Sequence, residues 1–271
     1  MKTLNNQTLL YDEDCPMCNL YTAAFIKTKM LDANGRKPFV TLTDAEANYI
    51  DMDRAKNEIA LVDTQNKKVI YGIDGLLKVI GFSFPVIEKI GNWKPMNYFL
   101  KKLYKFISYN RKVIIPSKEN THIKTQCIPD FNYFYRILYI VFATVFTAII
   151  LFYYSKNIPL IPNGNWTREL VLATGQIGFQ FLFIQKMTKE KQLNYIGNLV
   201  TISLMGSLLL FPILLLQKFV SPIVTLGWFG LTVTLMIAEH YRRTTVLELP
   251  KYVTATWILY RLIALLIILN L

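Results

Sequence analysis

The chain has 271 residues, of which 53% are hydrophobic, and a formal net charge of +12. The chain has three cysteines, Cys15, Cys18 and Cys127. This low, odd number does not suit a disulfide framework. A basic excess suits nucleic acid or an anionic membrane surface, but no basic run is interleaved with a nucleic-acid motif. Long apolar stretches from about Ile137 onward favour the membrane. Residues 1–10 show no secretory signal, so the N-terminal half is expected in the cytosol.

The N-terminal half predicts a small α/β domain. Four strands are expected, at residues 7–12, 38–42, 58–63 and 67–71, the last two as a hairpin around Gln65 and Asn66. Helical segments are expected at residues 19–30, 44–54 (a polar helix or loop) and 73–80. The order β-α-β-(α)-β-β-α is that of a thioredoxin-like fold.

The motif Cys15-Pro16-Met17-Cys18 follows the first expected strand and opens a helix. A helix N-terminus offers free N–H groups and partial positive charge, and both stabilise a thiolate. Pro16 suits the first helical turn, because the donor that proline lacks would be unpaired there anyway. Cys18 lies one turn later, where its thiol can close a disulfide with Cys15. The chemistry expected of this pair is therefore redox exchange.

Three carboxylates precede the motif, at Asp12, Glu13 and Asp14. Negative charge near Cys15 disfavours its thiolate, so the sequence leaves open the sign of its pKa shift. Asp12 is also a candidate for relaying protons to Cys18.

The sequence Tyr11-Asp12-Glu13-Asp14-Cys15-Pro16-Met17-Cys18 resembles the signature of the DCC thiol–disulfide oxidoreductase family, Tyr-Asp-Gly-x-Cys-x-x-Cys. Gly-Ile-Asp-Gly-Leu-Leu at 72–77 resembles the family's small-residue turn into a helix, and residues 103–111 resemble its Tyr-x-x-Ile-x-x-Asn-Arg end. The resemblance covers about residues 7–115. It implies a thioredoxin-like fold and a redox-active Cys15–Cys18 pair, with Tyr11, Asp12, Asp14 and Pro16 as further site residues. Two departures are Glu13 in place of glycine and no proline before Glu58, where thioredoxins carry a cis-proline.

Other functions stay open beside a thiol–disulfide oxidoreductase. The domain could be a non-catalytic redox-sensing or partner-binding module that gates the membrane part. A structural zinc site needs about four ligands, and the spare candidates are His122 and Cys127. Asp12-x-Asp14 after a strand also occurs in haloacid-dehalogenase-like phosphatases, but about 110 residues are too few for their larger sheet. We expect no cofactor and no metal, a protein or small-molecule thiol or disulfide as substrate, and no nucleic acid as partner.

Residues 93–113 predict an amphipathic helix. Its apolar residues fall on one side, at Met96, Phe99, Leu100, Leu103, Phe106 and Ile107. Basic residues, with Arg111 and Lys112 among them, lie elsewhere on the helix. We interpret it as a helix on the anionic cytoplasmic leaflet. The alternative, a domain helix whose apolar side is core, can coexist with this. Domain boundaries are expected at 1–115, 116–135 (a linker) and 136–271, and Cys127 is interpreted as an incidental or acylated thiol.

Five candidate membrane spans lie at about 136–154, 169–186, 194–216, 221–240 and 252–270. The second is the weakest, because Gln176, Gln180 and Gln185 interrupt it. Loop charges favour a cytosolic N-terminus. Six basic residues lie in the loops on that side, against three opposite: Lys186, Lys189, Lys191, Arg242, Arg243 and Lys251, against Lys156, Arg168 and Lys218. We therefore expect an integral membrane protein, of a bacterial inner membrane, with the N-terminal domain cytoplasmic.

Ionisable residues also lie within the expected spans. Arg261 falls near the middle of the last span. Glu239 and His240 lie near the cytoplasmic end of the preceding span and could reach Arg261. Gln176 and Gln180 fall on one helix face and are expected to bond between helices. The functional interpretation is an intramembrane polar site for a quinone, a lipid or an ion. The alternative is a snorkelling arginine or a structural ion pair.

Overall fold

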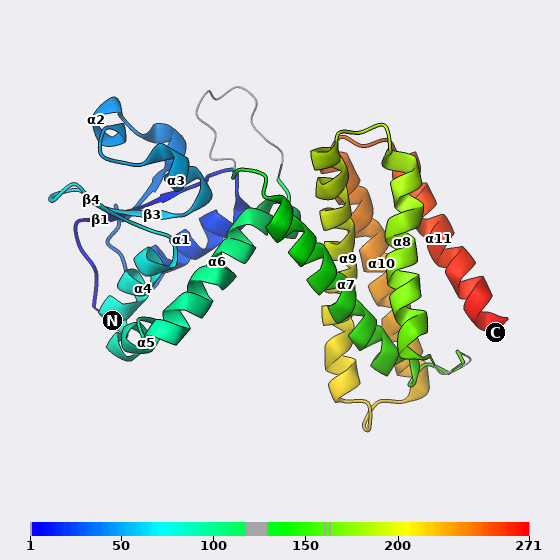
Figure 1. Cartoon of the computed structure of the whole chain (residues 1–271). Helices are drawn as coiled ribbons and strands as arrows, with labels where there is room; N and C mark the ends of the chain where they lie inside the picture. The colour runs from blue at the N-terminus through cyan, green and yellow to red at the C-terminus, as the bar shows by residue number, and fades with distance from the viewer. Residues whose placement is uncertain (1, 118–128, 160, 163, 271) are drawn as a thin grey trace. The chain divides into compact units, whose positions relative to one another are not determined.

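The structure is a computed structural model that describes residues 2–117, 129–159, 161–162 and 164–270. The chain forms two compact units, Met1–Tyr135 and Arg136–Leu271. The first combines a small sheet with helices, and the second is helical (Figure 1). His122 and Cys127, the candidates for additional zinc ligands, lie outside the described residues.

The first unit is built on a four-stranded mixed sheet. Its strands are β1 (Gln7–Tyr11), β2 (Arg36–Pro38), β3 (Ala60–Asp63) and β4 (Lys68–Tyr71), in the order β2-β1-β3-β4. β1 runs parallel to β2 and antiparallel to β3, which pairs with β4 as the expected hairpin. This is the strand arrangement of a thioredoxin-like core, and it confirms the predicted fold class.

Alternating side chains of the central strands build a core on each face of the sheet. Leu9 and Leu61 pack on one face with Val79, while Leu10 and Val62 pack on the other. This alternation is the period-two pattern of a strand buried on both sides. β1, which leads into the cysteine motif, is therefore held rigidly between its neighbours.

The second strand differs from its prediction at 38–42. β2 ends at Pro38, and Phe39–Thr41 form a short 3-10 helix instead. Proline has no N–H to donate to a strand ladder, so pairing ends there. The turn that follows buries Phe39 in the core.

Helices of the first unit surround this sheet (Figure 1). They are α1 (Pro16–Lys27), α2 (Asp44–Ala47), α3 (Met52–Asn57), α4 (Gly72–Ser83), α5 (Pro85–Gly91) and α6 (Lys94–Ile114). Gly72 begins α4 with a φ of +65°, and a Cβ there would meet Glu58 Oε2 at 2.9 Å. Glycine is therefore needed at this turn.

α6 turns its polar side, rather than its apolar side, toward the domain. The N–H of Ile59 donates to Tyr104 Oη at 2.8 Å, and Ser108 Oγ donates to the carbonyl of Asn57 at 2.5 Å. Phe99, Leu103 and Ile107, one turn apart from each other, are exposed. The alternative that this apolar side is domain core is therefore wrong for these three residues.

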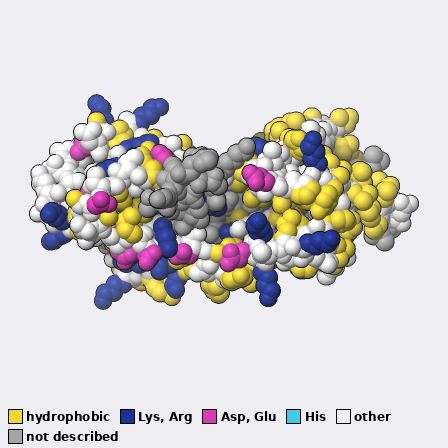
Figure 2. Space-filling model, turned by 90° about the horizontal axis from the view of Figure 1, so that it is seen from above, with side chains coloured by type: hydrophobic (Ala, Val, Ile, Leu, Met, Phe, Trp, Pro, Cys, Tyr) yellow, Lys and Arg dark blue, Asp and Glu magenta, His cyan; other side chains and the backbone are white. Residues whose placement is uncertain are grey.

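The second unit is a bundle of long helices. Its elements are α7 (Tyr133–Ser155), α8 (Trp166–Ile184), α9 (Lys189–Leu215), α10 (Pro222–Val246) and α11 (Tyr252–Leu269). Four of them, α7, α9, α10 and α11, are long and apolar enough to cross a membrane. Hydrophobic side chains cover much of the visible surface of this unit in Figure 2, which suits a surrounding of lipid tails.

α8 forms where a fifth span was predicted, but it does not reach the apolar character of the other four. Its first turn holds Arg168 and Glu169, and Gln176 and Gln180 are buried in its middle. It runs alongside the other helices of the bundle (Figure 1), and its 19 residues extend over roughly 28 Å. These polar residues lower the mean hydropathy of α8. The helix forms nevertheless, and Gln176 and Gln180 bond inside the bundle.

Candidate active site

Cys15 is the N-cap residue of α1. Its backbone is extended (φ −95°, ψ 107°), and Pro16 begins the helix behind it. The N–H of Cys18 donates to Cys15 Sγ at 3.5 Å, and the N–H of Cys15 donates to the carbonyl of Asp12 at 3.2 Å. The thiol of Cys15 therefore meets the free donors of a helix N-terminus, the position that favours a thiolate.

Both thiols of the motif are free and buried. Cys15 is 1% exposed and Cys18 is 7% exposed. Tyr11 and Tyr21 pack against the pair. A substrate sulfur can reach Cys15 only if its immediate neighbours move.

A buried cation compensates the carboxylate that precedes the motif. Arg111, near the end of α6, places Nη2 3.3 Å from Asp12 Oδ2 and donates to the carbonyl of Lys56 at 3.1 Å. Lys112 Nζ lies 4.0 Å from the same carboxylate oxygen. The sequence placed Arg111 among the basic residues of a membrane-facing helix. That assignment is wrong, because the guanidinium is buried beside Asp12.

The thiols of the motif differ in acidity. A hydrogen bond from Cys18 stabilises the Cys15 thiolate and, with the positive charge of Arg111, outweighs burial and the charge of Asp12, lowering the pKa of Cys15 to about 6. The same hydrogen bond and burial raise the pKa of Cys18 well above its ordinary value. This contrast favours Cys15 as the attacking thiol and Cys18 as the protonated partner. The three carboxylates left the sign of this shift open, and the hydrogen bond and Arg111 favour a lowered pKa of Cys15.

The remaining residues of the motif have distinct positions. Asp12 Oδ1 accepts the N–H of Asp14 at 3.1 Å, which holds the turn before Cys15. Glu13 and Pro16 are exposed. Among the described residues, Glu13 is not one of those with positive φ, so its position does not require the glycine of the family signature.

Arg36 and Tyr21 complete the surroundings of the thiols, and sequence reasoning missed both. Arg36 lies over the ring of Tyr11 at 4.3 Å and donates to its hydroxyl at 2.8 Å, so it fixes the orientation of Tyr11. Tyr21 follows Cys18 by three residues on the same helix and forms a side-chain hydrogen bond with it. Because residues three apart on a helix are neighbours, the spacing from Cys18 could have indicated Tyr21. Arg36 lies on another strand, and no sequence pattern linked it to the cysteines.

The acidity of Cys15 predicts a pH profile. The thiolate is the form that alkylates, so in a Cys127→Ser chain the rate of reaction with iodoacetamide should rise with pH through a midpoint of about 6 and level off above it. In the Cys18→Ser variant the thiol hydrogen bond changes and the midpoint should shift. A midpoint for Cys15 near that of an ordinary thiol, about 8.5, would contradict this account.

The bundle brings together some of the predicted intramembrane residues. Arg261 Nε donates to Gln176 Oε1 at 3.1 Å, and Gln180 Nε2 donates to the carbonyl of Val253 at 3.3 Å. The expectation that both glutamines bond between helices is confirmed. His240 contacts Tyr195 Oη and Thr254 Oγ1 instead of Arg261.

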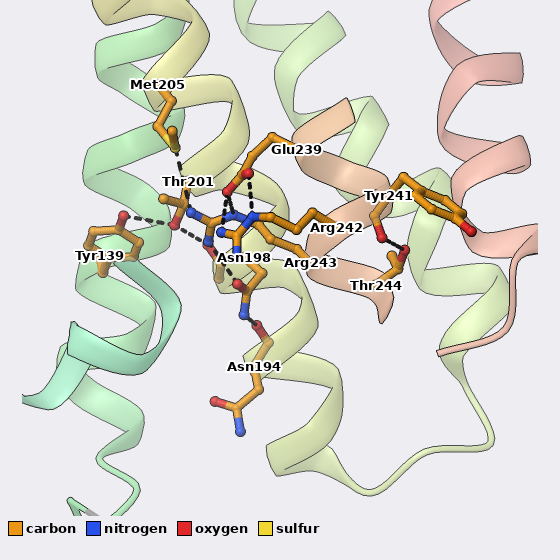
Figure 3. A network of polar contacts seen from close by, with 11 residues as sticks. Tyr139, Asn194, Asn198, Thr201, Met205, Glu239, Tyr241, Arg242, Arg243 and Thr244 are labelled. Carbon is orange, nitrogen blue, oxygen red and sulfur yellow. Dashed lines mark hydrogen bonds and ion pairs between the residues drawn. The ribbon is translucent and has the colours of Figure 1, made fainter. Parts of the chain in front are cut away.

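Glu239 belongs to a separate network of polar contacts (Figure 3). Its carboxylate pairs with both Arg242 and Arg243 at 2.7 Å, and Arg243 also donates to Asn198 Oδ1 at 2.8 Å. The prediction that Glu239 reaches Arg261 is therefore wrong. Two arginines within one helical turn of Glu239 compete successfully for it.

The fold and the site define a thioredoxin-like dithiol domain followed by helices able to cross a membrane. Residues 9–115 match the model of the DCC1-like thiol–disulfide oxidoreductase family. The N-terminal part of the chain is therefore similar to this family, in agreement with the resemblance of its motif. No curated protein and no solved structure matches the chain. In the described part of the chain, no group of three or more histidine, cysteine or acidic residues is placed to hold a metal ion.

Proposed function

We propose that the protein is a membrane-anchored thiol–disulfide oxidoreductase that uses the Cys15–Cys18 pair on the cytosolic face. The observation that carries the proposal is the contrast between the two thiols. Cys15 has a pKa lowered to about 6 at a helix N-terminus, while Cys18, one turn away, keeps its proton. An acidic attacking thiol with an adjacent protonated partner is the arrangement that disulfide exchange needs.

The exchange proceeds in two displacements. The Cys15 thiolate attacks one sulfur of a substrate disulfide, forming a mixed disulfide and releasing the other sulfur as a thiolate that takes a proton. Cys18 then loses its proton and attacks Cys15 Sγ, which releases the second substrate thiol and leaves a Cys15–Cys18 disulfide. The substrate gains two electrons, and an external dithiol must return them to the pair.

Turnover of a model disulfide tests the activity. The full-length protein in detergent, supplied with dithiothreitol, should accelerate reduction of insulin or of a glutathione-linked peptide disulfide. Equal rates of disulfide reduction with and without the protein would contradict the enzymatic proposal.

A second function, a non-catalytic redox sensor that gates the membrane unit, is favoured by one observation. Cys15 is 1% exposed, which suits slow oxidation by a small molecule better than rapid attack on a protein disulfide. A pair that oxidises reversibly but does not turn over insulin would support the sensor over the enzyme.

The cytosolic location is supported by the basic residues in the loops and at the adjoining helix ends, among them Arg242 and Arg243 near the end of α10. Basic residues favour the cytoplasmic side of a membrane. The count of six against three depends on α8 crossing with the other helices, and its course alongside them in Figure 1 supports this. Cysteine-specific labelling from each side of the membrane at Gln65→Cys, in a chain without native cysteines, measures the orientation directly.

The exposed apolar side of α6 supports contact between the domain and the lipid surface. Its exposed members are Phe99, Leu103 and Ile107, and the preceding segment also exposes Val86, Ile90 and Trp93. On the same helix, Lys94 and Lys102 form no ion pair with any described residue. Apolar side chains beside unpaired lysines suit the interface of an anionic bilayer. We include this contact in the proposal because the chain that follows is anchored in that bilayer.

A spin label on α6 tests the membrane contact. In a cysteine-free chain reconstituted in anionic nanodiscs, a label at Phe99→Cys, an exposed position of the apolar side, should be relaxed more strongly by oxygen, which dissolves in lipid, than by a water-soluble nickel complex. The matched control is Gln65→Cys, an exposed position in the hairpin turn, where the nickel complex should dominate. Equal nickel accessibility at the two positions would contradict the contact.

A further inference from the structure

All five helices of the second unit line a cavity of about 260 Å³. Most of its lining is apolar, with contributions such as Leu151 from α7 and Phe229 from α10. Arg261 and Gln176 lie in its wall. A mainly apolar cavity with a few polar groups is the usual form of a small-ligand site.

Four polar side-chain atoms of the cavity wall are buried without a hydrogen-bond partner. They are Thr144 Oγ1, Thr147 Oγ1, Gln176 Nε2 and Trp257 Nε1. None of these side chains is more than 7% exposed. An unpaired polar group in an apolar interior costs about 1–3 kcal/mol, so four around one cavity point to a ligand that pairs with them. Gln176 Nε2 and Trp257 Nε1 can only donate, which calls for acceptor atoms on that ligand.

The cavity also holds a positive charge without a matching carboxylate. Arg261 donates to Gln176 Oε1 and to Ser203 Oγ at 3.2 Å, and its guanidinium lies 4.9 Å from the centre of the Trp257 ring. Among the described residues no acid forms an ion pair with it. The other charges in the wall, Arg168 and Glu169, pair with each other at 2.7 Å, and Glu239 is engaged by Arg242 and Arg243 (Figure 3).

We propose that this cavity binds a single-chain lipophilic carboxylate. The carboxylate accepts hydrogen bonds from Arg261, Gln176 and Trp257 and neutralises the buried guanidinium. The hydrocarbon chain lies along the apolar wall. A neutral head group such as a quinone would satisfy the donors but leave the charge, so the anion is favoured. The site is independent of the thiol chemistry proposed for the first unit.

Equilibrium binding of radiolabelled laurate to the full chain in zwitterionic nanodiscs tests the proposal, with empty nanodiscs as the background. Saturable binding is expected, and Arg261→Gln should weaken it at least about tenfold, since 1.4 kcal/mol corresponds to that factor. Arg261→Lys, which keeps the charge, should bind more tightly than Arg261→Gln. The matched control is Arg242→Gln, an arginine outside the cavity wall, which should bind as the unchanged protein does.

Two competitors identify the head group in the unchanged protein, so the test stands even where Arg261→Gln does not fold. Methyl laurate, which lacks the charge, and decylubiquinone should each displace laurate at least about tenfold less well than unlabelled laurate does. No saturable laurate binding, or equal or tighter binding of either neutral competitor, would overturn the proposal.

Discussion

Replacing Cys15 by serine should lower the turnover of insulin disulfides by at least about a thousandfold, because removal of an attacking nucleophile leaves only binding effects. A serine hydroxyl at the helix N-terminus is not ionised at neutral pH and cannot form the mixed disulfide. The measurement is the initial rate of reduction with dithiothreitol as electron donor, compared with the unchanged full-length protein.

The two other cysteines provide controls with different expected results. Cys18→Ser keeps the nucleophile and should accumulate a mixed disulfide between Cys15 and the substrate, visible as a mass increase that dithiothreitol removes. Cys127→Ser should leave the rate unchanged. A Cys15→Ser variant that retains full turnover would assign the activity to another group.

Replacing Arg111 by glutamine should destabilise the first unit by about 3 kcal/mol, because breaking a buried ion pair leaves Asp12 with only the more distant Lys112 as a cationic partner. Both side chains of this pair are 6% exposed, so solvent cannot replace the lost partner. The pKa of Cys15 should also rise, since a neighbouring positive charge is lost. Denaturant unfolding followed by near-ultraviolet circular dichroism reports the stability, and the alkylation profile reports the pKa.

Two variants separate charge from packing at this position. Lys112→Gln removes a cation one residue away that lies 4.0 Å from Asp12, and its cost should be clearly smaller. The double change of Asp12→Asn with Arg111→Gln removes both charges and should recover part of the stability. An Arg111→Gln protein with unchanged stability and an unchanged Cys15 pKa would show that the ion pair contributes neither to stability nor to the acidity of Cys15.

Features that depend on neighbouring residues were the ones predictable from the sequence. The position of Cys15 at a helix N-terminus follows from a buried strand, a turn and Pro16 within ten residues. The pairing of β3 with β4 follows from two short apolar runs around a polar turn. The bonds made by Gln176 and Gln180 follow from amides four residues apart in an apolar helix, where they have no water to bond.

Features that depend on distant residues were missed. Arg111 lies 99 residues from Asp12, and in a helix with many lysines nothing in the sequence distinguishes a buried cation from an exposed one. Its burial accompanies the polar side of α6, which holds Tyr104 and Ser108 against the domain. Glu239 was assigned to Arg261 because both are rare charges in apolar segments, whereas Arg242 and Arg243 are nearer.

The central claim is that Cys15 and Cys18 form a reversible disulfide. Equilibration of the full-length Cys127→Ser protein with glutathione redox buffers, followed by acid quenching, alkylation and mass spectrometry, tests it most directly. The account predicts one two-electron transition between a doubly alkylated form and an unalkylated form whose peptides are joined through Cys15 and Cys18. Two free thiols across the whole range of buffers, including pure oxidised glutathione, would contradict it.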